Sequence, residues 1–110
     1  MANAFKNKTQ RQIGTSLTAI ESYTVAGSTE TTVIGLTIAN RAAAVIEVDV
    51  RLNDTSAHYY VVKNAPVPVG GALVVVGGDQ KLVMMPGDFV EVKSDTASSA
   101  DVIMSILEIT

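Results

Sequence analysis

The stretch VIEVDVRLN at residues 45–53 decides the fold. Apolar side chains occupy every second position, and the charged side chains lie between them: Glu47, Asp49 and Arg51. Successive side chains of a β-strand point to opposite faces, so this period of two predicts a strand. We expect its apolar face to pack on a core and its three charged residues to point to solvent.

The composition of the whole chain extends this prediction. Among 110 residues there are 16 Val, 8 Ile and 11 Thr, against only 6 Leu. Side chains branched at Cβ are stiff and fit a pleated sheet better than a helix. No window carries an apolar stripe at helical spacing with a cap at each end. The chain therefore reads as a single all-β domain.

Turn signals divide the chain into about eight short strands. The segments expected to be extended are 12–19, 20–25, 31–40, 45–53, 58–64, 72–76, 80–85, 89–93 and 101–110. Pro66 and Pro68 exclude a central strand, so residues 65–71 are predicted to be an extended connection. Short strands at this spacing are typical of an antiparallel β-sandwich, either a jelly roll or an immunoglobulin-like fold.

The N-terminal segment differs in charge from the rest of the chain. Residues 1–12 carry Lys6, Lys8 and Arg11 and no acid, and the remaining residues have 5 basic and 11 acidic side chains. We therefore predict a basic, extended arm at 1–12 and a sandwich domain at 13–110. Two interpretations of the arm stay open: a frayed terminus in solvent, or a segment that lies on an acidic surface of a neighbouring subunit.

Two further features suggest contacts beyond the domain. Residues 101–110 are apolar on both faces, which predicts a strand that is central in a sheet or covered by a partner. Tyr59 and Tyr60 are adjacent, so they should face opposite ways, one into the core and the other toward an interface. The candidate oligomer or capsid contacts are Phe5, Lys6, Lys8, Arg11, Tyr59 and Tyr60.

The residue types give little support to catalysis. The absence of cysteine excludes thiol chemistry and cysteine-ligated zinc, and His58 is the single histidine. Ser56 near His58 does not by itself make a triad, and Glu47 with Asp49 reads as a solvated pair on one strand face. Gly77-Gly78 lacks phosphate-loop spacing and reads as a hairpin turn. We expect no enzyme activity, no cofactor, no metal and no catalytic residue.

Charge and hydropathy exclude other partners. The net charge of -3 disfavours binding to nucleic acid. No secretory signal is apparent, and the longest apolar run is far shorter than the roughly 20 residues of a membrane helix. We therefore expect synthesis in the cytoplasm, with neither nucleic acid nor a membrane as partner.

Three stretches carry a resemblance to a known class of proteins. They are TVIGLTIAN at 32–40, YYVVKNAPVPVGGALVVVGGDQKLVMMPGDFVEVKS at 59–94, and DVIMSILEIT at 101–110. The layout resembles small β-sandwich structural proteins of tailed bacteriophages. The resemblance implies a virion protein that forms a homo-oligomer and contacts the major capsid or tail protein, with no small-molecule substrate. A capsid decoration or cement subunit is the first expectation. A tail, neck or fibre-adaptor component is the alternative, and a carbohydrate-binding module is a remote one.

Overall fold

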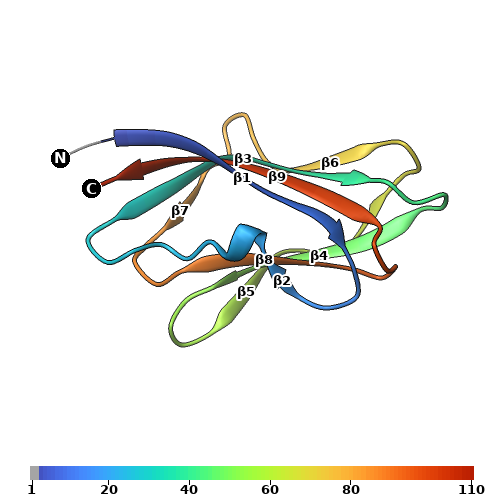
Figure 1. The fold of residues 1–110 in the computed structure, drawn as a ribbon, viewed down its shortest axis with the longest axis horizontal. Coiled ribbons are helices and arrows are strands. Elements are labelled where there is room, and N and C mark those ends of the chain that lie inside the picture. The colour runs from blue at the N-terminus through green and yellow to red at the C-terminus, as the bar shows by residue number, and fades with distance from the viewer. Residues whose placement is uncertain (1–2) are drawn as a thin grey trace.

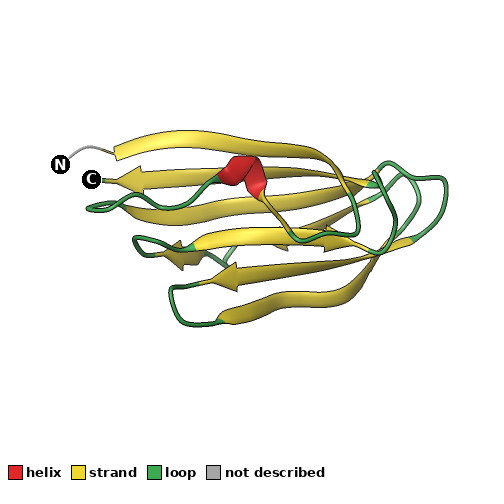
Figure 2. Ribbon diagram, turned by 60° about the horizontal axis from the view of Figure 1, so that its bottom comes forward, coloured by secondary structure: helices red, strands yellow, loops and turns green. Residues whose placement is uncertain are grey.

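Two antiparallel sheets pack face to face in the computed structural model, which describes residues 3–110 (Figures 1 and 2). The first sheet has the order β1-β9-β3-β6, and β7 also pairs with β3. The second sheet has the order β2-β8-β4-β5. The strands are β1 (Asn3–Ile13), β2 (Thr18–Ala19), β3 (Glu30–Asn40), β4 (Ile46–Asn53), β5 (His58–Val67), β6 (Ala72–Val76), β7 (Leu82–Met84), β8 (Phe89–Ser94) and β9 (Ala100–Ile109). A short 3-10 turn, η1 (Ile20–Ser22), follows β2.

The strands pair in a nested order. The first strand pairs with the last, β1 with β9; inside that pair β2 pairs with β8, then β3 with β6 and β7, and β4 with β5. A long ribbon of this kind, wound so that β9 also pairs with β3 and β8 with β4, is a jelly roll. The predicted antiparallel β-sandwich is confirmed, in its jelly-roll form.

The core lies between the two sheets and follows the period of two. In β4 the apolar residues Val48 and Val50 are fully buried, and in β9 the residues Val102, Met104 and Ile106 are buried in the same alternating way. Complete burial of such a side chain stabilises the fold by roughly 1.5–3 kcal/mol. The predicted central position of the last strand is confirmed, because β9 lies between β1 and β3.

The N-terminal segment differs from the sequence prediction of a separate arm. From Asn3 to Ile13 it forms strand β1, which pairs with β9 from Ile109 back to Ala100. The first sheet therefore begins at Asn3 rather than at residue 13, and residues 1 and 2 lie outside the described part. Backbone hydrogen bonds stabilise an edge strand even where its side chains are polar, which is why the polarity of this segment did not indicate a strand.

Other boundaries also differ. The predicted strands at 12–19 and 20–25 contain only the two residues of β2 and the turn η1, apart from the end of β1. Residues 65–67 belong to β5 although Pro66 lies among them. Because β5 is the edge strand of the second sheet, a proline there interrupts no ladder on its free side. Within residues 3–110 no helix is long and apolar enough to cross a membrane.

Candidate interaction surface

The middle of the outer face of the first sheet presents side chains without charge, and the charged residues Arg11, Asp101 and Glu30 lie at its ends. Residues of β9 that alternate with the buried Val102, Met104 and Ile106 point outward, and their partners in β1, β3, β6 and β7 do the same. We call this surface the uncharged face. It consists of Phe5, Asn7, Thr9, Thr32, Gly35, Thr37, Val74, Val83, Ile103, Ser105 and Leu107.

Large apolar side chains on the uncharged face are open to solvent. Phe5 is 77% exposed, Val74 64%, Val83 58% and Ile103 55%. A group of exposed apolar side chains on one flat sheet is a common mark of a protein interaction site. Of the predicted contact residues, Phe5 lies on this face and Arg11 at its margin, while Ile103, Val74 and Val83 were not predicted as contacts. The sequence signal for Ile103 was the last strand, which is apolar on both faces.

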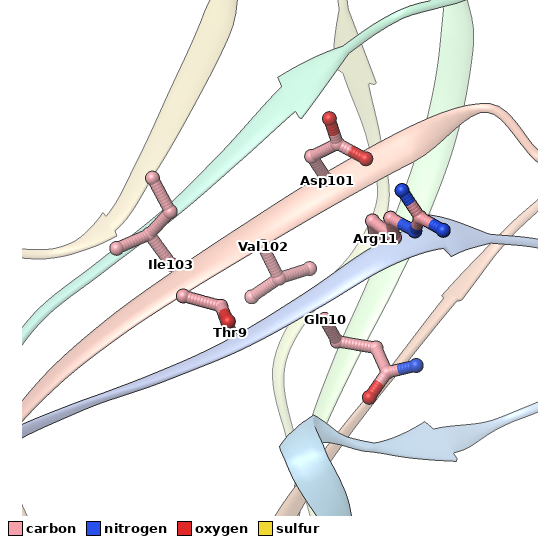
Figure 3. Close-up of a pocket in the computed structure, with 6 residues that line it drawn as sticks. All are labelled: Thr9, Gln10, Arg11, Asp101, Val102 and Ile103. Atoms are coloured by element: carbon pink, nitrogen blue, oxygen red, sulfur yellow. The ribbon is translucent and has the colours of Figure 1, made fainter.

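A depression of about 400 Å³ lies at the end of the uncharged face that is near Arg11 (Figure 3). Residues of two neighbouring strands line it: Thr9, Gln10 and Arg11 from β1, and Asp101, Val102 and Ile103 from β9. Nearby, Arg41 Nη1 lies 3.1 Å from Asp101 Oδ1, so the Asp101 carboxylate already has a cationic partner. The hollow is therefore lined by both apolar and polar residues, with one cation, Arg11, and one carboxylate, Asp101.

Lys6 and Lys8 point the opposite way from Phe5, toward the inner side of the first sheet. Lys6 Nζ lies 2.7 Å from Glu108 Oε1, and Tyr23 donates its hydroxyl to Glu108 Oε2 at 2.6 Å. Lys8 Nζ lies 3.7 Å from Glu21 and 5.3 Å from the centre of the Tyr23 ring. These two lysines, predicted to contact a neighbouring subunit, thus have acidic partners within their own chain.

This cluster shifts the ionisation of its members. Lys6 first, and then the Tyr23 hydroxyl, hold the pKa of Glu108 below its ordinary value, because both stabilise the carboxylate. Burial, together with the hydrogen bond to Glu108, raises the pKa of Tyr23 to about 12. A charged Glu108 and a neutral Tyr23 therefore hold the margin of the sandwich together at neutral pH.

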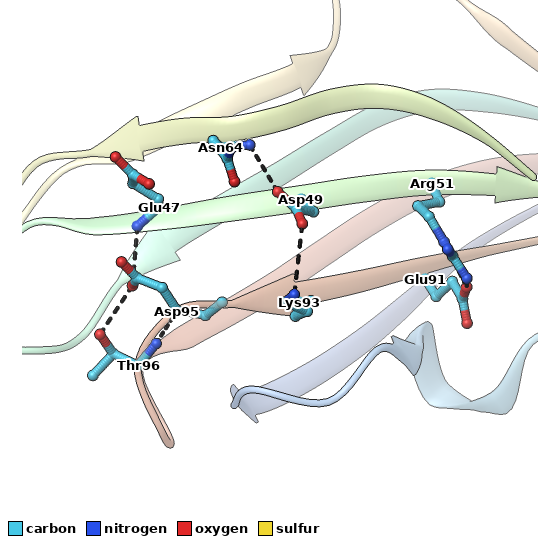
Figure 4. Close-up of polar contacts among 9 residues, drawn as sticks. Glu47, Asp49, Arg51, Asn64, Glu91, Lys93, Asp95 and Thr96 are labelled. Atoms are coloured by element: carbon cyan, nitrogen blue, oxygen red, sulfur yellow. Dashed lines mark hydrogen bonds and ion pairs between the residues drawn. The ribbon is translucent and has the colours of Figure 1, made fainter.

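The outer face of the second sheet carries paired charges, and we call it the charged face (Figure 4). Arg51 Nε donates to Glu91 Oε1 at 3.0 Å, and this carboxylate raises the pKa of Arg51. Asp49 Oδ1 accepts the backbone N–H of Asn64 at 2.7 Å, and Lys93 lies 3.9 Å from Oδ2. Asp49 was predicted to point to solvent. It lies on the outer face but is only 6% exposed, because Asn64 and Lys93 cover it.

Tyr59 and Tyr60 lie in β5 at the edge of the second sheet. They were predicted to divide between core and interface, but both are exposed. The reason is their place on an edge strand close to the turn at residues 54–57. Lys63 Nζ lies 4.7 Å from the centre of the Tyr60 ring, and the guanidinium of Arg51 lies 6.0 Å from it. The Tyr60 ring therefore already contacts two cations of its own chain.

Ser56 and His58, which were weighed for catalysis, contact different partners. Ser56 donates its hydroxyl to Asp54 Oδ1 at 3.1 Å, while His58 packs edge-on against Tyr60 with ring centres 6.0 Å apart. The backbone N–H groups of Ser56 and Ala57 lower the pKa of Asp54, as expected for an acceptor that closes a turn. Among residues 3–110 no group of three or more His, Asp or Glu is arranged to hold a metal ion.

Comparison with known proteins gives no assignment: no family model matches the chain, and no curated protein matches it. The uncharged face is therefore the feature of the structure from which function can be argued.

Proposed function

We propose that this chain is a structural subunit of a bacteriophage particle, most specifically a capsid decoration or cement subunit. The observation that carries the proposal is the uncharged face, where Phe5, Val74, Val83 and Ile103 are each more than half exposed on one sheet. Such a surface suits a protein whose work is to contact other proteins. The resemblance of 32–40, 59–94 and 101–110 to small tailed-phage proteins supports the same role.

The topology adds support by analogy. Jelly rolls are common among viral capsid domains, and they also occur in lectins and cupins. Because one fold serves many functions, the analogy supports the proposal only together with the surface. A subunit of this kind requires no reacting group; it requires a rigid sheet that presents the same contacts in every copy.

The test is the stoichiometry of purified particles of the phage that encodes the chain. Hundreds of copies per particle would support a decoration subunit, and six or twelve copies would support the tail, neck or fibre-adaptor alternative. A particle without the chain would overturn the proposal. In a complementation assay, Ile103→Glu should reduce the copies retained after washing, while the matched control Val45→Glu, at a side chain 58% exposed in the loop before β4, should not.

One observation favours the carbohydrate-binding alternative. Tyr59 is 55% exposed, and an exposed ring can stack on a sugar. A glycan array separates the two functions. Binding that is lost in Tyr59→Ala and kept in Phe5→Ala would favour the carbohydrate-binding module.

A further inference from the structure

We propose that the uncharged face binds the same face of a second copy, with the two β1 strands antiparallel and a two-fold axis along the row Asn7–Ser105–Gly35. This inference rests on the proposed function, because it names the partner of the same surface. These three residues stand opposite one another in β1, β9 and β3. Two sheets that stack face to face lie about 10 Å apart.

The shape of the face is self-complementary about this row. Phe5 stands opposite Leu107, two residues to one side of the Asn7–Ser105 pair. Thr9 stands opposite Ile103, two residues to the other side, and both line the depression of about 400 Å³. A two-fold axis through the row therefore places the exposed Phe5 ring of each copy over the hollow of the other. Phe5 would contact Ile103 there, and an aromatic ring seated in a hollow of its partner is a typical anchor of a protein interface.

The charges at the two ends of the face are also complementary. One end carries Arg11 and the ion pair of Arg41 with Asp101, with a net positive charge, and the other carries Glu30, opposite Ile109. Arg11 and Glu30 have no hydrogen-bond or ion-pair partner among residues 3–110. The antiparallel arrangement brings the Arg11 end of each copy over the Glu30 end of the other. Two strand spacings and the sheet spacing put the two backbone positions about 14 Å apart, and the long Arg11 and Glu30 side chains shorten the distance between their charges toward the Debye length of about 10 Å.

Pairing through the edge of β1 is disfavoured, which leaves the face as the contact. Lys6 and Lys8 point inward from this edge strand, and inward charges are a known device against edge-to-edge pairing. In an antiparallel pair of β1 strands centred on Asn7, Lys6 of one copy would stand opposite Lys8 of the other, a repulsive contact.

The size of the face predicts a weak dimer. The five strands of the first sheet, from the three residues of β7 to the eleven of β1 and β3, give roughly 600 Å² for each copy. The total of about 1,200 Å² is at the lower limit of specific interfaces. We therefore expect self-association in the micromolar range, which high local concentration on a particle would favour.

The first test measures association of the full chain by sedimentation equilibrium up to about 0.5 mM, where a micromolar dimer is fully formed. Phe5→Glu should weaken dimerisation at least about tenfold, because it removes the anchor and buries a charge. The matched control Val45→Glu adds the same charge at a side chain 58% exposed on another part of the surface and should leave dimerisation unchanged. Circular dichroism of both variants should match that of the parent chain.

The second test fixes the orientation. Arg11→Glu alone and Glu30→Arg alone should each weaken dimerisation about fivefold at low salt, since each places like charges together. The double variant should return to within about twofold of the parent chain. Only a partner that carries the same two residues in opposite positions gives this rescue.

The third test uses the absence of cysteine in the chain. Ser105→Cys lies on the axis, so a bis-maleimide that spans about 8–10 Å should link two copies across the sheet spacing. Thr37→Cys lies on the same face but off the axis, about 17 Å from its symmetry mate, and should not be linked.

A chain that stays monomeric at about 0.5 mM would overturn the inference. So would a dimer that is indifferent to Phe5→Glu, or one that the double charge reversal does not rescue. The outcome is separable from that of the proposed function. A monomeric chain present in hundreds of copies per particle overturns only the inference, and a dimer absent from particles overturns only the function.

Discussion

The two sheets of this sandwich place their charges on opposite sides. In the first sheet, Lys6 and Glu108 point inward at the margin of the core, and the middle of the outward surface is uncharged, with Arg11, Asp101 and Glu30 at its ends. In the second sheet, Arg51 and Glu91 point outward and pair with each other. The charges of the charged face thus have their partners within one subunit. The uncharged face leaves large apolar side chains in water, and the difference indicates which side of the molecule is made for another protein.

The largest expected effect tests whether the outer apolar residues stabilise the subunit at all. Ile106 is 1% exposed and Ile103 is 55% exposed, on opposite faces of β9. Ile106→Ala should cost about 2–5 kcal/mol of unfolding free energy, because it leaves a cavity in the core. Ile103→Ala should change it by less than about 0.5 kcal/mol in the monomer. Urea unfolding at low protein concentration measures both, and similar losses for the two variants would contradict the comparison.

The next effect concerns the buried acid of the charged face. Asp49→Ala should cost about 2–3 kcal/mol, since it leaves the N–H of Asn64 and the ammonium of Lys93 without their acceptor. Glu47→Ala is the matched control, on the same face of the same strand but exposed. It should stay within about 0.5 kcal/mol of the parent chain. If Asp49→Ala lowers the unfolding free energy by less than about 0.5 kcal/mol, the contacts of Asp49 with Asn64 and Lys93 do not stabilise the charged face.

A smaller effect concerns Glu108, whose contribution to the unfolding free energy should depend on pH. Because the folded pKa of Glu108 lies below its ordinary value of 4.5, its stabilisation is complete above pH 4.5 and is lost as the pH falls through the folded pKa. Glu108→Gln should cost about 1.5 kcal/mol at pH 7 and show a flatter loss of stability on acidification. Thermal unfolding from pH 7 to pH 3 measures this. Parallel profiles for the parent and the variant would exclude this role for Glu108.

The smallest effect compares two ion pairs. Arg51 and Glu91 have side chains 17% and 13% exposed, whereas Arg41 and Asp101, at the end of the uncharged face, are 41% and 42% exposed. A double-mutant cycle should give a larger coupling for the first pair than for the second, because water screens the more covered pair less. Both couplings should fall in 1 M salt. Equal couplings would contradict the idea that ion pairs stabilise the charged face more than the uncharged face.

Local patterns predicted the central strands well. The alternation in residues 45–53 indicated β4 and its buried face, and the double apolar pattern of residues 101–110 indicated both the central place of β9 and its exposed side. Each of these predictions needed only the alternation of side chains along one strand, because that alternation decides which face of the strand is buried.

The features that the sequence missed depend on distant partners. Strand β1 is polar, and its lysines are accommodated by Glu21 and by Glu108, which lies about a hundred residues away. Asp49 is covered by Asn64 of β5, which has a φ of 53° and donates its backbone N–H to the Asp49 carboxylate. The hollow beside Arg11 forms between β1 and β9 and belongs to neither strand alone. No local pattern encodes such contacts.

The nested pairing also has a consequence for how the chain reaches its native state. In the first sheet β9 is the common neighbour of β1 and β3, yet it is synthesised long after both. Neither early strand can complete its ladder until β9 arrives, and contacts so distant in sequence make folding slow, on the order of milliseconds to seconds. During that interval the free edges and apolar faces of β1 and β3 are open to other chains. Inward-pointing lysines on the earliest strand would then protect the nascent chain as well as the finished subunit.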